Sequence, residues 1–433
     1  MSPIIIGIFG IIVLFFVLLS RMPVGLVLTL VGFLGFSSLT TLEAGVSLLG
    51  NKPFTIASDY GLTVVPLFIL MGQFAFHSGV SERLYGTAHK VIGHLRGGLA
   101  MAGIVACALF AAICGSSVAT AATIGSVSFQ EMKKYNYDPK LAAGSLAAGG
   151  TLGILIPPSV AFIIYGIITE QSISELFIAG IFPGILLATL FIITIYVLTR
   201  FNPNLCPKVP KAKLKEMVVS LLGVTEALAL FALVMGGLFI GFFTPTEAGA
   251  IGALGALAIA LARRRLSWEG FISALNETLR ITAMTFVIII GAMIFSHFLV
   301  VTQIPAALVD VISRLPLPPF FIIAAIIVIF LIGGCFLDGP SLILILTPIF
   351  FPVVKALNIN PIWFGVIVVI MTEMGLLTPP VGLNVYTISG VAKDVPLEDI
   401  FRAIFPFLIP MIVCVIILMF FPQIALFLPG LMR

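Results

Sequence analysis

Charge is the scarcest feature of this sequence. Only 9% of its 433 residues are Asp, Glu, Lys or Arg, whereas 60% are hydrophobic; a soluble domain carries roughly a quarter charged residues. This shortage excludes a sizeable soluble domain. It favours a polytopic membrane protein, because apolar runs of about 20 residues, the length that spans hydrocarbon, recur along the whole chain. The net charge of +4 is better explained by membrane topology than by nucleic-acid binding.

Residues that bind metals or form disulfides are also few. The five cysteines include no CxxC pair, and four lie in apolar segments, where Cys is usually a small buried hydrophobe. The four histidines show no metal-ligand spacing. We therefore expect no disulfide framework, transition metal or cofactor. The first apolar run, 3–19, has no basic residue before it and no small-residue cleavage pattern, so we expect a retained helix rather than a signal peptide.

Proline and glycine, by contrast, are abundant, with 27 and 41 residues, and they recur in a pattern. When the sequence is shifted by about 220 positions, Pro157-Pro158 in "GILIPPSV" falls on Pro379-Pro380 in "GLLTPPVG". In the same register, "CGSSVA" (114–119) falls on "FLDGPS" (336–341). Matching helix breakers at matching places indicate an internal repeat, which is common in secondary transporters.

Each copy of this repeat contains five candidate crossings and one re-entrant helical hairpin. In the first copy, residues 1–210, the hairpin lies at about 98–132 and the candidate spans are 3–19, 22–40, 61–76, 141–168 (broken at the prolines) and 176–199. In the second copy, residues 211–433, the hairpin lies at about 319–357 and the spans are 221–242, 245–262, 281–300, 361–391 (broken) and 400–421. Because five is odd, the second copy must be inverted. The expected fold is an all-α polytopic membrane protein of two inverted-topology repeats, each with a hairpin and a discontinuous helix.

The distribution of basic residues supports this topology. Of the 22 Lys and Arg residues, 18, including Arg21 and Lys208, fall on one predicted side of the membrane. Basic loops are typical of the cytoplasmic side. We therefore expect both termini to be periplasmic. The four basic residues on the other side are Lys52, Arg314, Lys355 and Arg433.

Three further segments have structural interpretations. Residues 81–96 and 302–315 each precede a hairpin and mix apolar with charged residues at helical spacing, as amphipathic interfacial helices do; helical extensions or loops are the alternative. "TPTE" (244–247) has the form of a capping box with proline at the first helical position. Glu226 and His297 lie in expected spans, and the sequence shows no partner for either.

The hairpin tips and broken helices are the candidate binding site. Proline interrupts a helix, and irregular backbone survives in a bilayer only where it is buried or lines a cavity. Half-helix ends near the midplane attract ions, and hydroxyl and carboxylate oxygens suit hard cations such as sodium. An anionic substrate flanked by sodium ions fits such a site; prolines that only tune helix packing are the alternative. The candidate residues are Gly115, Ser116, Ser117, Thr120, Gly153, Pro157, Pro158 and Ser159 in the first half, and Gly334, Asp338, Gly339, Ser341, Glu373, Gly375, Thr378, Pro379, Pro380 and Asn384 in the second.

Only the second half carries acids near the expected midplane. Asp338 and Glu373 align with Ser116 and Thr151 of the first half. A buried carboxylate is costly unless it is paired or ion-bound, so both acids are functional candidates. Asp338 can ligate a cation or cap the second hairpin helix, and Glu373 can ligate a cation, carry a proton or pair with a polar group. Asn384 can contact substrate or satisfy freed carbonyls.

Together these motifs resemble a known family. The segments "GSSVATAATIGSV" (115–127), "AAGGTLGILIPPSV" (147–160), "TPTEAGA" (244–250), "FLDGPSLILILTPIFFPV" (336–353) and "MGLLTPPVGLNVY" (374–386) resemble the large membrane subunit of tripartite ATP-independent periplasmic (TRAP) transporters. The resemblance covers nearly the whole chain. It implies an elevator-type, sodium-coupled importer of a dicarboxylate, keto acid or sialic acid in the bacterial inner membrane. It also implies two partners, a small four-helix membrane subunit and a soluble periplasmic protein that delivers the substrate.

In that family the hairpins and broken helices move as one body against a scaffold. The resemblance implies that roughly 99–199 and 318–421 are mobile and that 81–96 and 302–315 are connecting arms. A stand-alone sodium- or proton-coupled carboxylate carrier is the main alternative function. A more remote one is an intramembrane enzyme that uses Asp338 and Glu373, although no nucleophile or metal set accompanies them.

Overall fold

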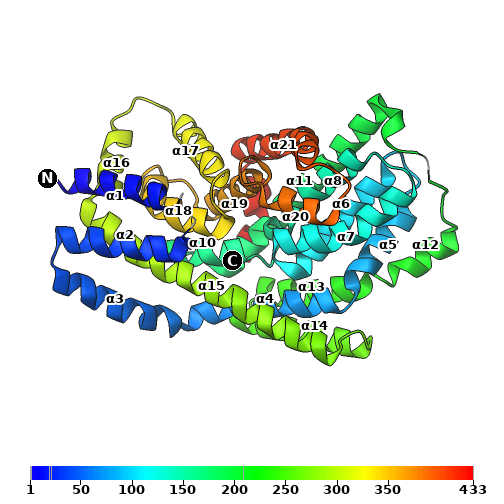
Figure 1. Ribbon diagram of the computed structural model, residues 1–433, viewed down its shortest axis with the longest axis horizontal. Helices are drawn as coiled ribbons and strands as arrows, with labels where there is room; N and C mark the ends of the chain where they lie inside the picture. Colours follow the sequence, from blue (N-terminus) through cyan, green and yellow to red (C-terminus); the bar gives the residue numbers. More distant parts are fainter. Residues whose placement is uncertain (1, 19, 21, 208, 433) are drawn as a thin grey trace.

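The computed structural model describes every residue except 1, 19, 21, 208 and 433. Arg21, Lys208 and Arg433, used above to compare charge, lie outside the described part, as does Leu19 of the first expected span. Within the described part the regular structure is helical throughout (Figure 1). The α-helices are α1 (Pro3–Leu18), α2 (Val24–Leu39), α3 (Leu42–Ala57), α4 (Val64–His77), α5 (Val80–Ile92), α6 (Gly98–Cys114), α7 (Ser117–Lys134), α8 (Pro139–Gly150), α9 (Leu152–Leu155), α10 (Val160–Thr169), α11 (Ile173–Phe201), α12 (Leu214–Leu221), α13 (Thr225–Phe239), α14 (Pro245–Ala262), α15 (Trp268–Thr302), α16 (Ile304–Ser313), α17 (Pro319–Gly334), α18 (Gly339–Ala356), α19 (Pro361–Leu377), α20 (Leu383–Val391), α21 (Leu397–Phe420) and α22 (Gln423–Leu431), with 3₁₀ turns at Tyr60–Thr63 and Pro203–Leu205.

Several of these helices are long and apolar enough to cross a membrane. The described residues contain seven such segments, and an eighth if α8–α9 and α10, bent by 42° at their break, count as one span. The two N-terminal helices are apolar but shorter, at 16 residues each. The seven segments are Tyr60–His77, Ile173–Phe201, Leu214–Phe239, Pro245–Ala262, Trp268–Thr302, Gly339–Ala356 and Leu397–Phe420.

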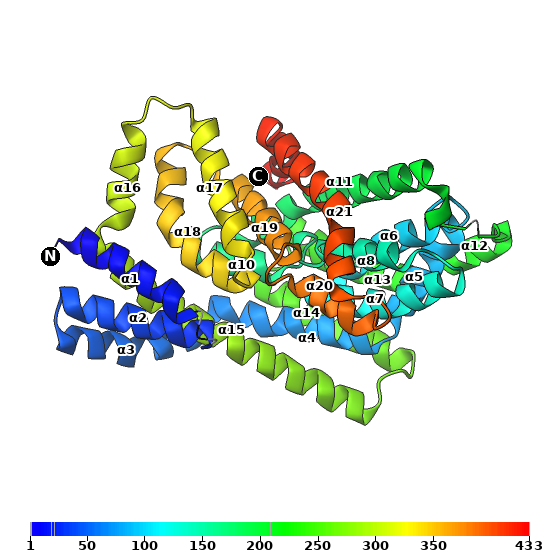
Figure 2. The same cartoon turned by 45° about the horizontal axis from the view of Figure 1, so that its top comes forward.

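Two helical hairpins lie where the sequence places them. In the first, α6 packs on α7, and Gly115 adopts the left-handed conformation (φ 71°) that ends α6. Ser116 then caps α7, accepting a hydrogen bond from the Ala119 backbone amide at 3.3 Å. In the second, α17 packs on α18 and the turn contains Asp338 (Figure 2). A left-handed glycine followed by a capping serine makes a sharp reversal, so the tip is encoded locally.

The helices pack across the two halves of the chain in a reciprocal way. The second hairpin helix of the first half, α7, packs on α20 of the second half, whereas α18 packs on α10. Likewise α2 lies along α15, and α4 lies along α14 (Figure 1). α2, α4 and α10 therefore have their main partners in the opposite half, whereas α7 packs on α20 in addition to its more extensive packing on α6 and α8.

Both expected helix breaks are present. Pro157 and Pro158 separate α9 from α10, and Pro379 and Pro380 separate α19 from α20; both Pro-Pro peptide bonds are cis. Ser159 caps the helix after the first break through the Phe162 amide, at 3.4 Å. The prolines of the first break are buried, whereas those of the second are exposed.

Three regions differ from the spans drawn on the sequence. Residues 42–57, expected as a connection, form α3, which starts at a Thr41 cap and packs on α2 and α15 although it contains Pro53. The span expected at 281–300 is part of the 35-residue α15. Residues 214–221 form a separate helix, α12, before α13. A Thr41 cap and packing support α3, and a Ser267 cap starts α15 well before its apolar centre; hydropathy alone detects neither.

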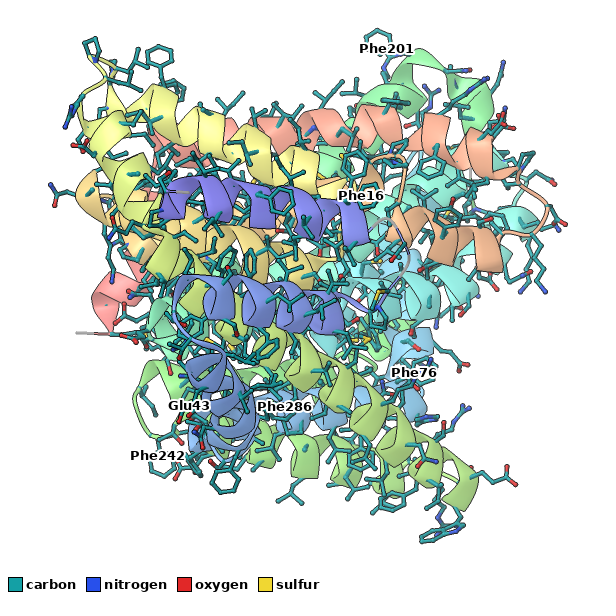
Figure 3. The ribbon with its side chains drawn as sticks, turned by 60° about the vertical axis from the view of Figure 1, so that its left-hand side comes forward. Phe16, Glu43, Phe76, Phe201, Phe242 and Phe286 are labelled. Atoms are coloured by element: carbon teal, nitrogen blue, oxygen red, sulfur yellow. The ribbon has the colours of Figure 1, made fainter. Side chains whose placement is uncertain are left out.

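The surface of the molecule is rich in apolar side chains. Phe201 and Phe242 lie at the edge of the molecule in Figure 3, and Phe16 and Phe76 are labelled in the same view; each of the four is at least 44% exposed. Apolar side chains on such a scale are unusual on a soluble protein and suit a surface in contact with lipid. The expected capping box is confirmed: Thr244 and Glu247 exchange hydrogen bonds at the start of α14, with Pro245 at its first position.

Candidate ion and substrate site

The first hairpin tip is pressed against the first broken helix. A Cβ added at Gly153 on α9 would lie 2.5 Å from the Ser116 carbonyl oxygen and 2.6 Å from Thr120 Oγ1. A Cβ at Gly115 would lie 2.8 Å from the Pro158 carbonyl oxygen. Only glycine allows the tip and the break to approach so closely. The approach brings the Ser116 and Pro158 carbonyls and the Thr120 hydroxyl close to the two glycines.

The second hairpin tip makes the corresponding contact with the second broken helix. A Cβ at Gly375 would lie 2.4 Å from Gly334 Cα, so the two backbones touch. The Val381 amide, just beyond the prolines, donates a hydrogen bond to the Cys335 carbonyl at 3.2 Å. Gly153 and Gly375 are 222 residues apart in the repeat alignment, and each is the point at which a break meets its own tip.

Asp338 stands at the N-cap position of α18 but makes no capping hydrogen bond with its side chain. Its carboxyl faces the hydroxyl and amide of Ser341, outside ordinary hydrogen-bond geometry, and the buried Ser341 hydroxyl has no partner among the described residues. Gly339 lies beside Thr372, whose Cγ2 would be 3.1 Å from an added Cβ. The Asp338 side chain thus makes no capping hydrogen bond in this structure, and its role as a cation ligand stays a prediction.

Glu373 is the most deeply buried acid of the site. It lies on α19 with 1% of its surface exposed, and neither carboxyl oxygen has a hydrogen-bond partner among the described residues. The carboxyl faces the Ser117 hydroxyl of the first hairpin and the Asn384 amide of α20, without ordinary hydrogen-bond geometry to either. Ser117 and Asn384 are also buried. The structure thus brings Ser117, which the sequence placed in the first-half set, together with Glu373 and Asn384 of the second-half set.

The other candidate residues occupy different surroundings. Thr378 ends α19 and donates its hydroxyl to the Met374 carbonyl at 2.8 Å. Ser159 serves as a helix cap, and Pro157 and Pro158 are buried beside the first tip. Pro379 and Pro380 are exposed and do not enclose the buried acid. The two halves are therefore alike in backbone plan but unlike in polar side chains and in exposure.

Sequence reasoning missed several buried hydroxyls on the same helices. Each lacks a hydrogen-bond partner among the described residues, and together they extend the polar surface of the hairpin helices inward. Helical spacing was an available signal, because Ser117, Thr120 and Thr123 recur every three residues along α7. The missed residues are Thr123 and Ser128 on α7, Thr347 on α18 and Thr372 on α19.

Glu226, for which the sequence showed no partner, lies at the centre of an ion-pair cluster. It accepts hydrogen bonds from Arg83 on α5 and from Arg263 at the end of α14. A third contact nearby joins the Thr87 hydroxyl on α5 to the Ser220 carbonyl of α12, at 2.6 Å. These partners are 37 to 143 residues apart, so only the tertiary fold reveals them. The cluster ties α5 to α13 and α14.

Comparison with known proteins places these features in a family. The family model for the DctM component of tripartite ATP-independent periplasmic transporters matches residues 11–424. The C4-dicarboxylate TRAP transporter large permease protein DctM of Pseudomonas aeruginosa is 39% identical over 88% of this chain and 89% of its own. The sialic acid TRAP transporter large permease protein SiaM of Vibrio cholerae is 33% identical over 96% of both.

The fold also resembles a solved membrane transporter. The YdaH transporter of Alcanivorax borkumensis matches with a TM-score of 0.66 at 16% identity, over 87% of this chain and 88% of its own. At that identity the likeness concerns the fold alone, and it agrees with the all-helical polytopic architecture expected from the sequence. The family model and the two permease relatives show that the chain belongs to the DctM family, the large membrane component of tripartite ATP-independent periplasmic transporters.

Proposed function

We propose that this chain imports an organic acid across the bacterial inner membrane, coupled to sodium, after a periplasmic binding protein delivers the acid. A small four-helix membrane subunit completes the complex. The observation that carries the proposal is the buried cluster of Glu373, Ser117 and Asn384, in which a carboxylate and two polar groups from both halves face one another without hydrogen bonds. Proteins keep buried polar groups unpaired at a high cost, so such a cluster favours a ligand that pairs with them.

Sodium suits the oxygen atoms of this cluster and of the tips. A carboxylate buried in a bilayer is stabilised by a bound cation, and a hard cation takes carboxylate, hydroxyl, amide and backbone oxygens. The close tip-to-break contacts at Gly153 and Gly375 add backbone oxygens. Bound sodium then provides positive charge for an anionic substrate, since no basic side chain lies at either tip or break.

The substrate class follows from the family and from this charge pattern. The relatives described above are named for C4-dicarboxylate and for sialic acid, both of which carry carboxylates. We infer a carboxylate substrate held by hydroxyls, backbone amides and sodium. Substrate and sodium neutralise each other, which lowers the cost of moving the loaded site through the membrane.

Two packed groups of helices support an elevator movement. The first group contains the hairpins and broken helices, in which α7 packs on α20, α8 on α21 and α10 on α18. The second contains α2, α4, α14 and α15, which pack on one another. We propose that the first group, within residues 99–199 and 318–421, moves as one body. The second group is the scaffold, and α5 and α16 are the arms that connect the two groups. Each of the two inverted repeats contributes helices to both groups.

Uptake into proteoliposomes tests this proposal. The chain and its small subunit are reconstituted, a labelled C4-dicarboxylate and sialic acid are offered in turn with the binding protein, and an inward sodium gradient is imposed or replaced by choline. We expect uptake of one of the acids to require both sodium and the binding protein. Uptake without the binding protein would instead indicate a stand-alone carrier, and uptake indifferent to sodium would overturn the coupling.

Matched variants locate the ion site. Ser117→Ala removes a buried, unpaired hydroxyl, and Asp338→Asn removes the charge at the second tip; both are expected to lower uptake at least tenfold and to raise the sodium concentration needed. Ser126→Ala on the same helix is the control, because Ser126 is exposed and its hydroxyl is bound to the Thr123 carbonyl. Equal effects at Ser117 and Ser126 would place the ion site elsewhere.

A further inference from the structure

An apolar groove lies outside the transport site, between α5, α6 and the α12–α13 segment. It encloses about 370 Å³ and is lined by side chains such as Val91, Val105, Leu109, Leu221 and Leu228. That volume lies within the range of pockets that hold small molecules, roughly 300–1,000 Å³. Leu221 and Leu228 at its lip are 52% and 48% exposed, so the groove opens to the surface of the molecule.

The side chains that line this groove have no free hydrogen-bonding group for water. Two of its lining residues are polar, and both hydroxyls are already bound: Thr87 donates to the Ser220 carbonyl at 2.6 Å, and Thr225 donates to the Leu222 carbonyl at 2.9 Å. A buried water needs two to four polar partners, which these walls do not provide. An apolar occupant is therefore favoured. In a membrane the abundant apolar groups are the acyl chains of lipids.

A basic interfacial helix leads into the same groove. α12 has no buried residue, exposes Val218, Val219 and Leu222, and lies beside α5 at the edge of the molecule in Figures 1 and 2. Although Leu214–Phe239 as a whole is long and apolar enough to cross a membrane, α12 is a separate helix of eight residues at its start, and a short exposed helix flanked by lysines suits the membrane surface. Its end, Leu221, forms part of the groove lip.

The charges around α12 suit a phosphate group. Lys211, Lys213 and Lys215 are exposed at its start, against one acid, Glu216. Lys215 is six residues before Leu221, or roughly 9 Å along a helix. A lipid headgroup at Lys215 would therefore lie a short distance from an acyl chain that enters the groove at Leu221. Next to the groove, Arg83 and Arg263 share the single carboxylate of Glu226, so this cluster also keeps a positive charge.

We propose that the groove binds an acyl chain of an anionic phospholipid, whose headgroup is held by Lys215 of α12 and by Lys211 and Lys213 just before it. Basic residues beside an apolar crevice are the features that recognise anionic lipids at the cytoplasmic surface. The site joins α5 and α6 to α13 through the lipid. Its existence does not depend on the transport proposal.

Native mass spectrometry of the delipidated complex with its small subunit tests this site. Phosphatidylglycerol or phosphatidylcholine is added in detergent, and the fraction of complexes that retain a lipid is measured. Wild type is expected to retain phosphatidylglycerol several-fold more than phosphatidylcholine. Leu228→Trp, which fills the groove from its lip, should reduce retention several-fold. Leu233→Trp is the matched control, because Leu233 lies on the same helix, is also 48% exposed and does not line the groove.

Two further variants separate the acyl chain from the headgroup. Leu228→Ala leaves the groove open and should retain lipid, which excludes a general folding defect at this position. Lys213→Gln/Lys215→Gln should abolish the preference for phosphatidylglycerol, whereas Lys393→Gln/Arg402→Gln, at exposed sites distant in sequence, should not. Equal retention by the two Trp variants, or no lipid preference in wild type, would overturn the proposal.

Discussion

At the scale of single residues, Glu373 is the most informative group in the protein. Its carboxyl is buried among apolar helices, and its neighbours, Ser117 and Asn384, can each offer an oxygen or a proton. An ionised carboxylate in such a place costs several kcal/mol when it has no partner. A cation that binds there removes this cost. The apo protein should therefore be measurably less stable than the sodium-bound protein.

The variant Glu373→Gln tests whether the buried negative charge destabilises the apo protein and whether sodium removes that cost. Glutamine has nearly the same shape but no negative charge, so we expect the variant to be at least as stable as wild type in choline and to lose stabilisation by sodium. For wild type, sodium at 100 times its dissociation constant would add about 2.7 kcal/mol. The thermal midpoint of the purified complex in sodium and in choline measures both effects. A sodium-dependent rise in the variant equal to that of wild type would contradict the role given to Glu373.

The paired glycines offer a second test at this scale. Gly375→Ala places a Cβ 2.4 Å from the backbone of Gly334, and Gly153→Ala places one 2.5 Å from the Ser116 carbonyl. Neither neighbour is a flexible side chain, so the tip must move away from the break, at a cost of about 1–3 kcal/mol. We expect lower thermal stability and loss of uptake in both variants.

Gly390→Ala on α20 is the control for the paired glycines. No atom lies within 4 Å of its added Cβ, and alanine favours a helix over glycine by roughly 0.5–1 kcal/mol. This variant is expected to be neutral or slightly stabilised and to keep its uptake. If Gly375→Ala and Gly390→Ala behave alike, close approach at the tip is not required.

At the scale of elements, α5 is held from both sides. Glu226 ties it through Arg83 to α13 and α14, and the ring of its His89 packs edge-on against Tyr135 at the end of the first hairpin, with centroids 5.7 Å apart. One face thus meets the proposed scaffold and the other the proposed mobile group. An arm that transmits movement needs both attachments.

Glu226→Gln tests the scaffold attachment. It leaves Arg83 partly buried and close to Arg263 without a counter-charge, so we expect a loss of about 1–3 kcal/mol in stability. Thermal unfolding at low and high salt measures the loss, which should shrink at high salt because the two arginines are then screened. Glu277→Gln is the control: its contact with Arg280 is 3.9 Å long and exposed, and its loss should change stability by less than about 0.5 kcal/mol.

His89 makes the attachment to the hairpin sensitive to pH. Burial lowers the pKa of His89, an effect that the Glu131 carboxylate opposes and Lys90 reinforces. The unfolded chain, with a histidine pKa near 6.5, then binds more protons than the folded protein as the pH falls, so stability is present above pH 6.5 and is lost below it. Thermal midpoints from pH 7.5 to 5 should fall more steeply for wild type than for His89→Gln. Parallel curves would show that His89 does not carry this dependence.

The elements were predictable from sequence to different degrees. The hairpin tips and both breaks were visible because glycine and proline restrict the backbone locally, whatever surrounds them. Helix α3 was not, since Pro53 and the polar residues Asn51 and Lys52 conceal a helix that packing against α2 and α15 supports. The meeting of Ser117 with Glu373 was also hidden, because an alignment of the halves compares equivalent positions rather than contacts between them.

At the scale of the whole molecule, two repeats of five crossings each would place both termini on the same side of the membrane. The distribution of basic residues predicts that this side is the periplasm. A reporter active only outside the cytoplasm, such as alkaline phosphatase, should be active when fused after the last residue, and green fluorescent protein at the same position should be dark. Fusions at residue 210, in the basic connection between the halves, should give the opposite result. Fluorescence at the C-terminus would overturn its periplasmic placement, and fluorescence at both fusion sites would overturn the odd number of crossings in the second half.

The reciprocal pairing of helices has a consequence for biosynthesis. While the ribosome is still making the second half, α2, α4 and α10 are already in the membrane, but their main partners α15, α14 and α18 are not, and α7 still lacks its contact with α20. Contacts so distant in sequence form late and slowly. We therefore expect the first half to wait in the membrane with α5, α6, α7 and α8 able to pack on one another, but with α2, α4 and α10 lacking their final neighbours. Factors that shield nascent membrane segments would protect this chain most between the synthesis of α11 and that of α20.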